Sequence, residues 1–275
     1  MTQQTRRYPL PLLVGLVLIS IIFIMAVLSI FWLPYQLGDT SGSRLGAPSL
    51  HHWFGTDKLG RDLLSRIMIG ARIAFEVGLL SVAIGAFLGV LLGLGAGFAQ
   101  RWMDESFSAL LDILIAFPTL LLAMLIVATR GASLTSAIVA IGLGMSAIIA
   151  RLTRLLVKRV LTQDYITASR ASGTSWPRVI VVHILPNIWP TLIVIFALQF
   201  GLAGLTEASL SYLGLGSPPP NASWGSLLQE AQATVLTAPI AAIVPGLLLI
   251  ALVIGMNMIA DGLREVADPT MRRSR

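Results

Sequence analysis

Long apolar runs alternate with short polar segments along the whole chain. Most runs approach or exceed the ~20 apolar residues that a helix needs to cross a bilayer core, and one is interrupted by glycines and a few polar residues. The pattern predicts an all-α polytopic membrane protein with six transmembrane helices, near residues 10–33, 73–99, 109–129, 134–157, 187–207 and 238–260.

The first apolar run is expected to be a retained span rather than a secretory signal. It extends over 24 residues from Leu10 to Leu33, whereas a signal core has about 7–15 apolar residues, and no A-x-A cleavage site follows it. The expected organisation has two parts. Residues 1–72 form an N-terminal cytoplasmic tail, the first span and an extracytoplasmic region. Residues 73–275 form a five-helix core with a polar loop at 162–187 and a cytoplasmic C-terminal tail.

Composition and charge placement agree with this topology. Hydrophobic residues make up 56% of the chain and charged residues 12%, against about 25% charged residues in soluble domains. The net charge of +6 is not read as nucleic-acid binding, because thirteen of the nineteen Lys and Arg residues fall in segments on the same side as the termini. This asymmetry predicts that both termini, with Arg6, Arg7, Arg272, Arg273 and Arg275, are cytoplasmic.

The sequence offers little support for catalysis or metal binding in this chain. Gly55 to Arg61 superficially resembles a phosphate-binding loop, but the lysine and hydroxyl positions hold other residues and no strand precedes it. His51 and His52 are adjacent and lack a carboxylate cluster, so no metal site is expected. An intramembrane enzyme would need a nucleophile or metal motif, and none occurs.

Two features of the spans suggest helix packing. Gly85, Gly89, Gly93 and Gly97 recur every four residues, so they share one helix face where another backbone can approach closely. In the third run, Pro118 is expected to kink or break the helix. Asp112 near its start is interpreted mainly as an interfacial or helix-pairing residue, with ion coupling as the alternative.

The loop at 162–187 is expected to form two short helical pieces. Asp164 can cap a first piece from Tyr165 to Ser172, and Gly173 can end it. Ser175 can cap a second piece that runs until Pro186 interrupts it. The first piece has small side chains and could dock into a groove of a partner protein, or the loop could be an ordinary basic segment on the inner membrane surface. These residues alone do not decide between the two.

The same loop resembles the EAA loop of ABC importer permeases. Thr167-Ala168-Ser169, Gly173 and Leu185-Pro186 keep its spacing, while Thr167 replaces the family's glutamate and His183 its isoleucine. Three further stretches, at 54–72, 210–225 and 257–272, are similar to the C-type subunit of the dipeptide, oligopeptide and nickel branch. The resemblance therefore extends over essentially the whole chain and implies a type I ABC importer permease fold.

The resemblance implies a function and a set of partners. The segment 165–173 would be the coupling helix that docks on an ATPase, with contacts or re-entry positions at Tyr165, Thr167, Ala168, Ser169, Arg170, Gly173, Leu185 and Pro186. Contacts at the outer mouth or with a binding protein would involve Glu207, Ser211, Tyr212 and Trp224. The implied partners are two ATP-binding subunits that hold ATP and Mg, a second B-type permease, and an extracytoplasmic substrate-binding protein.

The implied activity is ATP-driven import across the bacterial cytoplasmic (inner) membrane, with no cofactor in this chain. Di- or oligopeptides are the expected substrates, and nickel chelates, glutathione or another small molecule are the alternatives. The competing class is an ion-coupled secondary transporter, which would need charges near the membrane midplane and paired broken repeats. Asp112 and Glu207 are the two candidates for such charges, and the halves of the sequence show no internal repeat.

Overall fold

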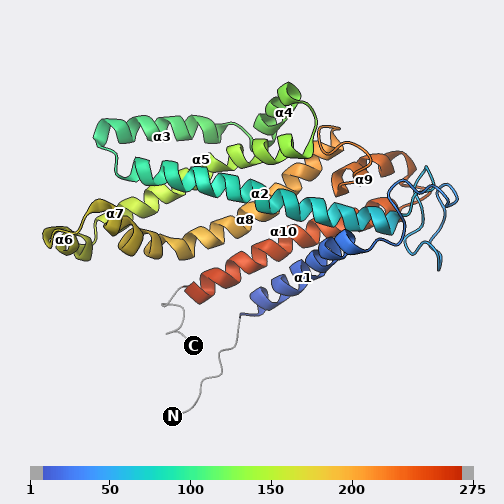
Figure 1. Cartoon of the computed structure of the whole chain (residues 1–275), viewed down its shortest axis with the longest axis horizontal. Helices are drawn as coiled ribbons and strands as arrows, with labels where there is room; N and C mark the ends of the chain where they lie inside the picture. Colours follow the sequence, from blue (N-terminus) through green and yellow to red (C-terminus); the bar gives the residue numbers. More distant parts are fainter. Residues whose placement is uncertain (1–8, 268–275) are drawn as a thin grey trace, which may run out of the picture.

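The computed structural model describes residues 9–267, and in this range it contains helices and loops (Figure 1). The N-terminal residues 1–8 and the C-terminal residues 268–275, with the five tail arginines named above, lie outside the described residues. The elements are α1 Leu10–Phe31, α2 Leu63–Gly97, α3 Arg101–Ala116, α4 Thr119–Arg130, α5 Leu134–Leu161, α6 Asp164–Ala171, α7 Trp176–Val179, the π-helix η1 Ile180–Ile184, α8 Leu185–Tyr212, α9 Trp224–Ala231, the short 3-10 helix η2 Gln232–Thr234, and α10 Ile240–Ala267.

The helices form an elongated bundle whose two ends are different. Five helical segments in the described part of the chain are long and apolar enough to cross a membrane, and the bent pair α3 and α4 gives a sixth if it is counted as one span. In Figure 1, α6 lies at one end, toward which α1 begins and α10 ends. The loop between α1 and α2, together with α9, lies at the opposite end. We call these the α6 end and the α9 end.

The second span begins ten residues earlier than the sequence suggested. The apolar run starts near residue 73, but α2 starts at Leu63, because Asp62 caps it by accepting hydrogen bonds from Ser65 N at 2.8 Å and Ser65 Oγ at 2.9 Å. Arg66 lies in the first turn of α2, where its charge is paired with the carboxylates of Asp57 and Glu230. The loop between the first two spans therefore ends at residue 62 rather than 72.

The predicted break at Pro118 is confirmed. The helices α3 and α4 meet there at an angle of 81°. Phe117, directly before the proline, is extended with φ −78° and ψ 122°, as expected from the clash between a proline ring and the preceding residue. The helical part also begins earlier than predicted, at Arg101.

The expected interruption at Pro186 is wrong. The segments α7, η1 and α8 form one helical run of 37 residues from Trp176 to Tyr212, with Pro186 in the first turn of α8. A π-helical turn precedes it, in which the Leu185 N–H donates to the Ile180 carbonyl five residues back. The Asn187 side chain also donates to the His183 carbonyl at 2.7 Å. The wider turn and this side-chain bond accommodate the missing proline donor.

The glycine row of α2 forms a packing face, as predicted, and its partner is α5. All four glycines are buried, and a Cβ atom added at Gly89 would lie 2.6 Å from the Ile149 Cβ atom. At Gly93 and Gly97 the nearest atoms, on Thr153 and Val157, would lie 2.5 Å away. This close seam joins the two helices over about three turns and fixes the position of α5, which continues into α6.

Candidate functional site

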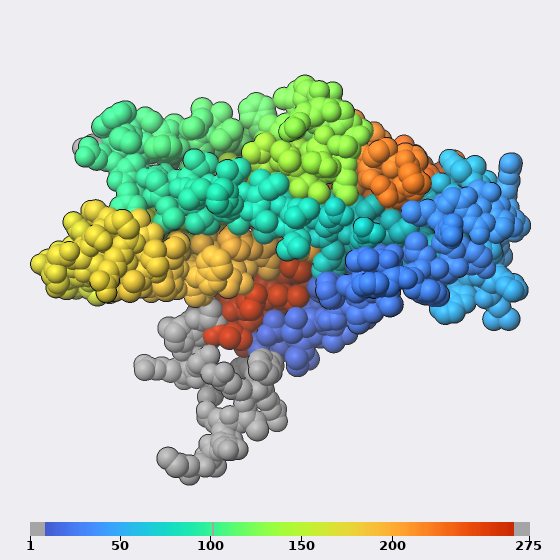
Figure 2. Space-filling view, viewed as in Figure 1, coloured from blue at the N-terminus to red at the C-terminus, as the bar shows by residue number. Residues whose placement is uncertain are grey.

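The short helix α6 forms the tip of the molecule at the α6 end (Figures 1 and 2). Its first residue is Asp164 and its N-cap is Gln163, which makes no side-chain capping bond. The expected Asp164 cap is therefore wrong by one position. The carboxylate lies in the first turn instead, where it complements the positive end of the helix. The chain between α5 and α6 is so short that the last turn of α5 sets where α6 starts.

Gly173 ends α6, as the sequence predicted. Its φ of +82° belongs to the left-handed region that glycine adopts with little strain. Around it, Gly173 N donates to the Arg170 carbonyl at 3.0 Å and Thr174 N donates to the Ser169 carbonyl at 3.2 Å. These bonds satisfy carbonyls at the helix end and turn the chain toward α7. Ser175 is the N-cap of α7, but it makes no side-chain capping bond.

The predicted coupling residues lie on the outside of α6. Within α6, which the structure describes in full, Ile166 alone is buried, with 2% of its surface exposed. It belongs to a cluster with Val157, Val179 and Ile184. Tyr165, Thr167, Ala168 and Arg170 are exposed and Ser169 is half-buried. One buried isoleucine thus anchors a helix whose other faces remain available.

Several contacts tie α6 to the helix that follows. The Ser169 Oγ atom lies 3.3 Å from His183 Nε2, and the Tyr165 and His183 ring centroids are 6.0 Å apart. The Arg170 guanidinium lies 4.4 Å above the Trp176 ring. His183 stands where the family pattern has isoleucine, so this departure supplies a polar link between α6 and η1. Leu185 and Pro186 lie in the first turn of α8, outside the exposed face of α6.

Sequence reasoning missed the aromatic support of this element. The Phe98 ring at the end of α2 packs edge-on against the Trp176 ring, with centroids 5.2 Å apart. The cation–π contact of Arg170 and this aromatic pair together connect α6 with α2 through Trp176. The available signal was the W-P pair at the start of α7 and a phenylalanine at the end of the glycine row. Neither feature specifies a partner without the fold.

At the opposite end, the predicted contact residues are mostly buried. Glu207, Ser211 and Trp224 expose 2%, 3% and 1% of their surfaces, whereas Tyr212 exposes 39%. The expectation that all four present a contact surface is therefore wrong for three of them. Ser211 Oγ donates to Glu207 Oε1 at 2.5 Å, inside α8. Among the four, Tyr212 alone has an exposed side chain.

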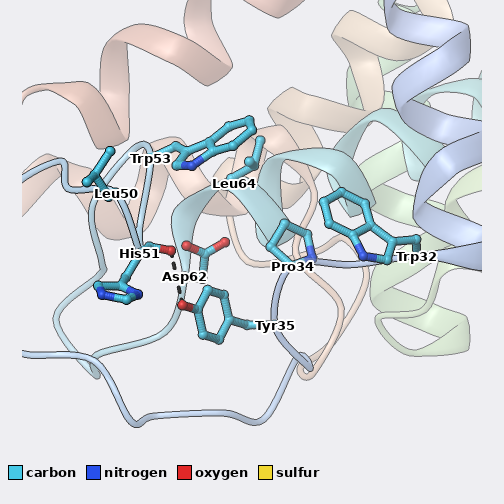
Figure 3. A pocket seen from close by; sticks show the side chains of 8 residues that line it. All are labelled: Trp32, Pro34, Tyr35, Leu50, His51, Trp53, Asp62 and Leu64. Carbon is cyan, nitrogen blue, oxygen red and sulfur yellow. Dashed lines mark hydrogen bonds between the residues drawn. The ribbon is translucent and has the colours of Figure 1, made fainter.

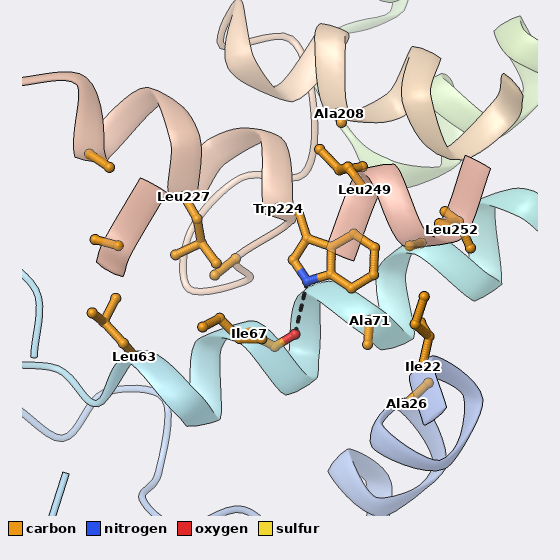
Figure 4. Close-up of a cluster of buried hydrophobic side chains, with 14 residues drawn as sticks. Ile22, Ala26, Leu63, Ile67, Ala71, Ala208, Trp224, Leu227, Leu249 and Leu252 are labelled. Atoms are coloured by element: carbon orange, nitrogen blue, oxygen red, sulfur yellow. Dashed lines mark hydrogen bonds between the residues drawn. The ribbon is translucent and has the colours of Figure 1, made fainter. Parts of the chain in front are cut away.

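Trp224 is a core residue that joins α9 to α2. Its indole Nε1 donates to the Ile67 carbonyl at 3.1 Å, and the ring lies among Ile22, Ala71 and Leu252 (Figure 4). A Cβ atom at Gly70 would come within 2.3 Å of the indole ring, so the glycine makes room for it. The physical reason for the error is that an amphipathic aromatic side chain suits a buried site with one acceptor as well as a membrane boundary.

An ion-pair network that the sequence did not reveal holds α9 against the start of α2. Asp57 Oδ2 accepts from Arg61 Nε at 2.6 Å and from Arg66 Nη1 at 2.7 Å. Arg66 also binds both oxygens of Glu230, at 2.8 Å each, and Arg61 reaches Glu230 at 3.0 Å. The four-residue spacing of Asp57 and Arg61 was a local signal, but Glu230 lies 164 residues from Arg66 and only the fold brings it there.

The network keeps both carboxyl groups ionised. Burial acts to raise the pKa of Asp57, but hydrogen bonds from Arg61 and Leu59 and the nearby Arg66 charge outweigh it and lower the pKa. For Glu230, burial also acts to raise the pKa, while the hydrogen bonds and charge of Arg66 and the charge of Arg61 bring it below its ordinary value. A lowered native pKa adds stability above the unfolded-state pKa, and this stability is lost as the pH falls through the native pKa.

We therefore expect Glu230→Gln to destabilise the protein in a pH-dependent way. At pH 7 the variant should lose about 1–3 kcal/mol, because a buried arginine loses a charged partner. The difference should shrink as the pH falls below about 4, where the wild-type carboxylates begin to take up protons. Thermal unfolding midpoints of both proteins in detergent, measured from pH 7 to pH 3, check this. A difference that stays constant across that range would contradict the assigned ion pair.

A cavity of about 250 Å³ lies in the loop region at the α9 end. Trp32, Tyr35, His51, Trp53 and Asp62 contribute to its lining (Figure 3). The Asp62 carboxylate is already engaged by Ser65 and by His52 Nδ1 at 3.0 Å, while Tyr35 Oη donates to the His51 carbonyl at 3.0 Å. Within the described residues, no group of three His, Cys, Asp or Glu side chains is arranged to hold a metal ion.

Asp112 takes part in helix pairing, which was the main expectation for it. Its Oδ1 atom lies 3.1 Å from Arg151 Nη1 on α5. A second link joins the same helices nearer the α6 end, where Asp104 accepts from Arg154 Nε at 2.7 Å and from Lys158 Nζ. The side of α3 that bears Asp104 and Asp112 therefore faces the basic part of α5.

Comparisons with known proteins agree with this architecture. Residues 85–273 match the family described as "Binding-protein-dependent transport system inner membrane component". The chain is 40% identical over 261 residues to a dipeptide transport system permease protein of Alkalihalophilus pseudofirmus, covering 94% of this chain and 86% of that protein. A glutathione transport system permease protein of Pectobacterium atrosepticum is 37% identical over 260 residues, with 91% and 86% covered.

A solved structure has the same fold. A chain from the inward-facing MetNI methionine ABC transporter superposes with a TM-score of 0.58 at 22% identity, covering 75% of this chain and 97% of that one. With the family match over most of the sequence and two relatives above 30% identity, the chain belongs to the binding-protein-dependent transport system inner membrane components, the non-catalytic membrane-spanning permease subunits of ABC importers.

Proposed function

We propose that this permease imports short peptides, di- or oligopeptides, as one of two membrane subunits of an ATP-driven importer. The observation that carries the substrate class is the 40% identity to a dipeptide permease over 94% of the chain. The similarity to glutathione permeases supports glutathione as a second candidate. Glutathione is itself a tripeptide, so both candidates carry an ammonium group and carboxylates on a short peptide chain.

In the proposed orientation, the α6 end faces the cytoplasm and the α9 end faces outward. Arg154, Lys158, Arg159, Arg170 and Arg178 gather in or near the last turns of α5 and around α6, which supports a cytoplasmic location by the positive-inside rule. Both termini would then be cytoplasmic. The loop of residues 32–62, Tyr212 and α9 would lie where an extracytoplasmic binding protein delivers substrate.

We assign α6 as the coupling helix that docks on the partner ATPase. Its exposed small side chains, Thr167 and Ala168, suit close contact with a groove, and Tyr165 and Arg170 flank them. The contacts of Ser169 and Tyr165 with His183 connect α6 to the helical run that ends at Tyr212. A displacement of α6 is therefore passed to α8 as a nearly rigid movement, which is what alternating access requires.

The implied partners divide the work. Two ATP-binding subunits would hold ATP and Mg and would draw the α6 helices of the two permeases together or apart. A second, B-type permease would complete the pathway. A nucleotide shifts the populations of the inward-open and outward-open states only to the extent that it binds one state more tightly than the other.

The test is peptide uptake into proteoliposomes that contain this permease with its second permease and ATPase subunits. Uptake of a labelled dipeptide is expected to require ATP and the binding protein, and a protonophore should leave it unchanged. Liposomes loaded with a non-hydrolysable nucleotide are the control. If a protonophore abolishes uptake and uptake does not depend on ATP, the protein is an ion-coupled secondary transporter instead.

A further inference from the structure

The central helix of the bundle keeps one exposed strip. Of the five long helical segments that qualify as spans, α5 is the most buried, with 61% of its apolar window inside the molecule compared with 22–33% for the others. It is packed against α2, α3, α4 and α8. Its exposed positions are Thr135, Leu143, Arg151, Leu155 and Arg159. The last three recur every four residues and therefore share one face of the helix, which forms the exposed strip.

An ion pair lies on this strip among apolar side chains. The side chains of Arg151 and Asp112 are 52% and 54% exposed, with 3.1 Å between them. Exposed apolar residues lie on both sides of the pair along the two helices: Leu110, Ile113 and Leu114 on α3, and Leu143 and Leu155 on α5. The pair thus lies among apolar side chains, about two turns from the exposed Arg159 on α5.

The second ion-pair link between the same helices has a different character. The side chains of Asp104 and Arg154 are only 16% and 13% exposed, and they join α3 to α5 eight residues away from Asp112, which is about 12 Å along a helix. Leu111, Ala147 and Ala150 pack between the helices. These contacts already attach α3 to α5, so the exposed pair is not required for that purpose.

A charged pair so exposed is not expected to face lipid. Ionised side chains at membrane depth are costly in hydrocarbon and normally face a protein interior or a water-filled cavity. In the proposed importer, the pathway that this permease would form with a second permease would be such a cavity. Because an exposed ion pair holds together only weakly, it can also separate at little cost and exchange its partners.

We propose that Asp112 and Arg151 line the translocation pathway and contact the charged ends of a zwitterionic peptide. The guanidinium group of Arg151 would donate to the substrate carboxylate, a geometry that favours two parallel hydrogen bonds, and the Asp112 carboxylate would accept from the substrate ammonium group. When the two residues give up their contact with each other and bind the two ends of the peptide, the net charge of the site does not change. This inference rests on the proposed peptide import and adds the residues that recognise the peptide termini.

The first arm of the test asks whether water reaches the strip. The chain contains no cysteine, so the Leu155→Cys variant places a single thiol one turn from Arg151 and leaves the ion pair intact. A positively charged, membrane-impermeant methanethiosulfonate should label it in the assembled transporter, and cycling with dialanine, binding protein and ATP should slow the labelling at least threefold. The Phe87→Cys variant, at a site on α2 that is 66% exposed, is the matched control and should stay unlabelled.

The second arm asks whether the charges matter to transport itself. Asp112→Asn and Arg151→Gln should each lower ATP-driven dialanine uptake about tenfold or more, the effect of losing a hydrogen bond to a charged group. Copurification of the ATPase and the thermal unfolding midpoint should stay at the wild-type values. A structural role would instead lower the midpoint in step with uptake, and exchange of the two charges in a double variant would then restore both.

The results separate the two proposals. If Leu155→Cys is unreactive from both sides, or is labelled at the same rate during peptide transport, the pathway assignment is overturned even though wild-type uptake proceeds. Wild-type rates in both neutral variants overturn it as well. If the wild-type transporter carries no dialanine at all, the proposed peptide import fails, while labelling of Leu155→Cys still reports whether water reaches the strip.

Discussion

A single methyl group added at Gly93 is expected to destabilise this permease strongly, whereas the same change two residues away should not. In Gly93→Ala the new Cβ atom would lie 2.5 Å from the Thr153 Cβ atom and 2.6 Å from the Ala150 carbonyl oxygen. One of these neighbours is backbone, so rotation of a side chain cannot relieve the clash. The α2 and α5 helices must move apart, at a cost of about 2–3 kcal/mol or more.

The matched control is Gly95→Ala on the same helix. Nothing lies within 4 Å of its added Cβ atom, so the change should be neutral or should stabilise the helix by up to ~1 kcal/mol. Gly85→Ala should fall between the two, because its nearest neighbour, the Gly142 carbonyl oxygen, lies 3.1 Å away. Among the three variants, the thermal unfolding midpoint in detergent should be lowest for Gly93→Ala, intermediate for Gly85→Ala and highest for Gly95→Ala. Equal midpoints for the variants at Gly93 and Gly95 would rule out the close seam.

Replacing Ala168 by arginine is expected to abolish coupling to the ATPase without unfolding the permease. Ala168 is exposed on α6, so the longer side chain projects from the chain's own fold but blocks close contact with a groove and adds a charge there. ATP-driven uptake and ATPase copurification should both fall about 100-fold or more, the result expected when an interface contact loses about 3 kcal/mol. Gly38→Arg, at an unobstructed exposed position at the other end of the molecule, should leave ATPase copurification unchanged.

Gly173 gives an independent test of the same helix. The backbone at Gly173 has φ +82°, and there is open space around its Cα atom. Gly173→Val should therefore weaken coupling through backbone strain at the helix end, and Gly173→Asn should retain more of it, because asparagine tolerates the left-handed region better. If ATPase copurification and peptide-stimulated hydrolysis survived both Ala168→Arg and Gly173→Val, α6 would not be the coupling helix.

The same α2–α5 seam is expected to affect coupling as well as stability. It holds the last turns of α5 next to the end of α2, and the Phe98 ring there supports Trp176 and, through it, Arg170 of α6. A seam variant that still folds should therefore also lose coupling, whereas Ala168→Arg should lose coupling alone. The two variants together separate the support of α6 from its contact surface.

The site was partly predictable because α6 is defined by local rules. A segment with small and polar side chains that ends in glycine specifies a short helix and its stop, and Gly173 adopts the required φ. The faces of this helix were not predictable in the same way. The burial of Ile166, and the contacts of Ser169 with His183 and of Arg170 with Trp176, depend on residues from α5, η1 and α7 that meet only in the fold.

At the α9 end, by contrast, the sequence predicted few of the contacts. Glu207, Ser211 and Trp224 were expected to be contact residues because the resemblance placed them near the outer mouth. In the fold, α9 packs against α8 and α2, its first residue Trp224 enters the core, and Glu207 and Ser211 on α8 are buried. The ion pairs of Arg66 with Asp57 and Glu230 were equally invisible, because one partner comes from nine residues before it and the other from 164 residues after it.

The sequence by itself determined the approximate place of the apolar helices, the glycine seam, the break at Pro118 and the stop at Gly173. Each depends on local chemistry, namely hydrophobic length, four-residue spacing, or the φ angles that proline and glycine allow. Only the tertiary structure decided where α2 begins, how a π-helical turn accommodates Pro186, which candidates are buried, and that Asp112 meets Arg151 on an exposed strip. Those outcomes depend on which distant side chains share a surface, because burial and ion pairing are properties of packed helices rather than of segments.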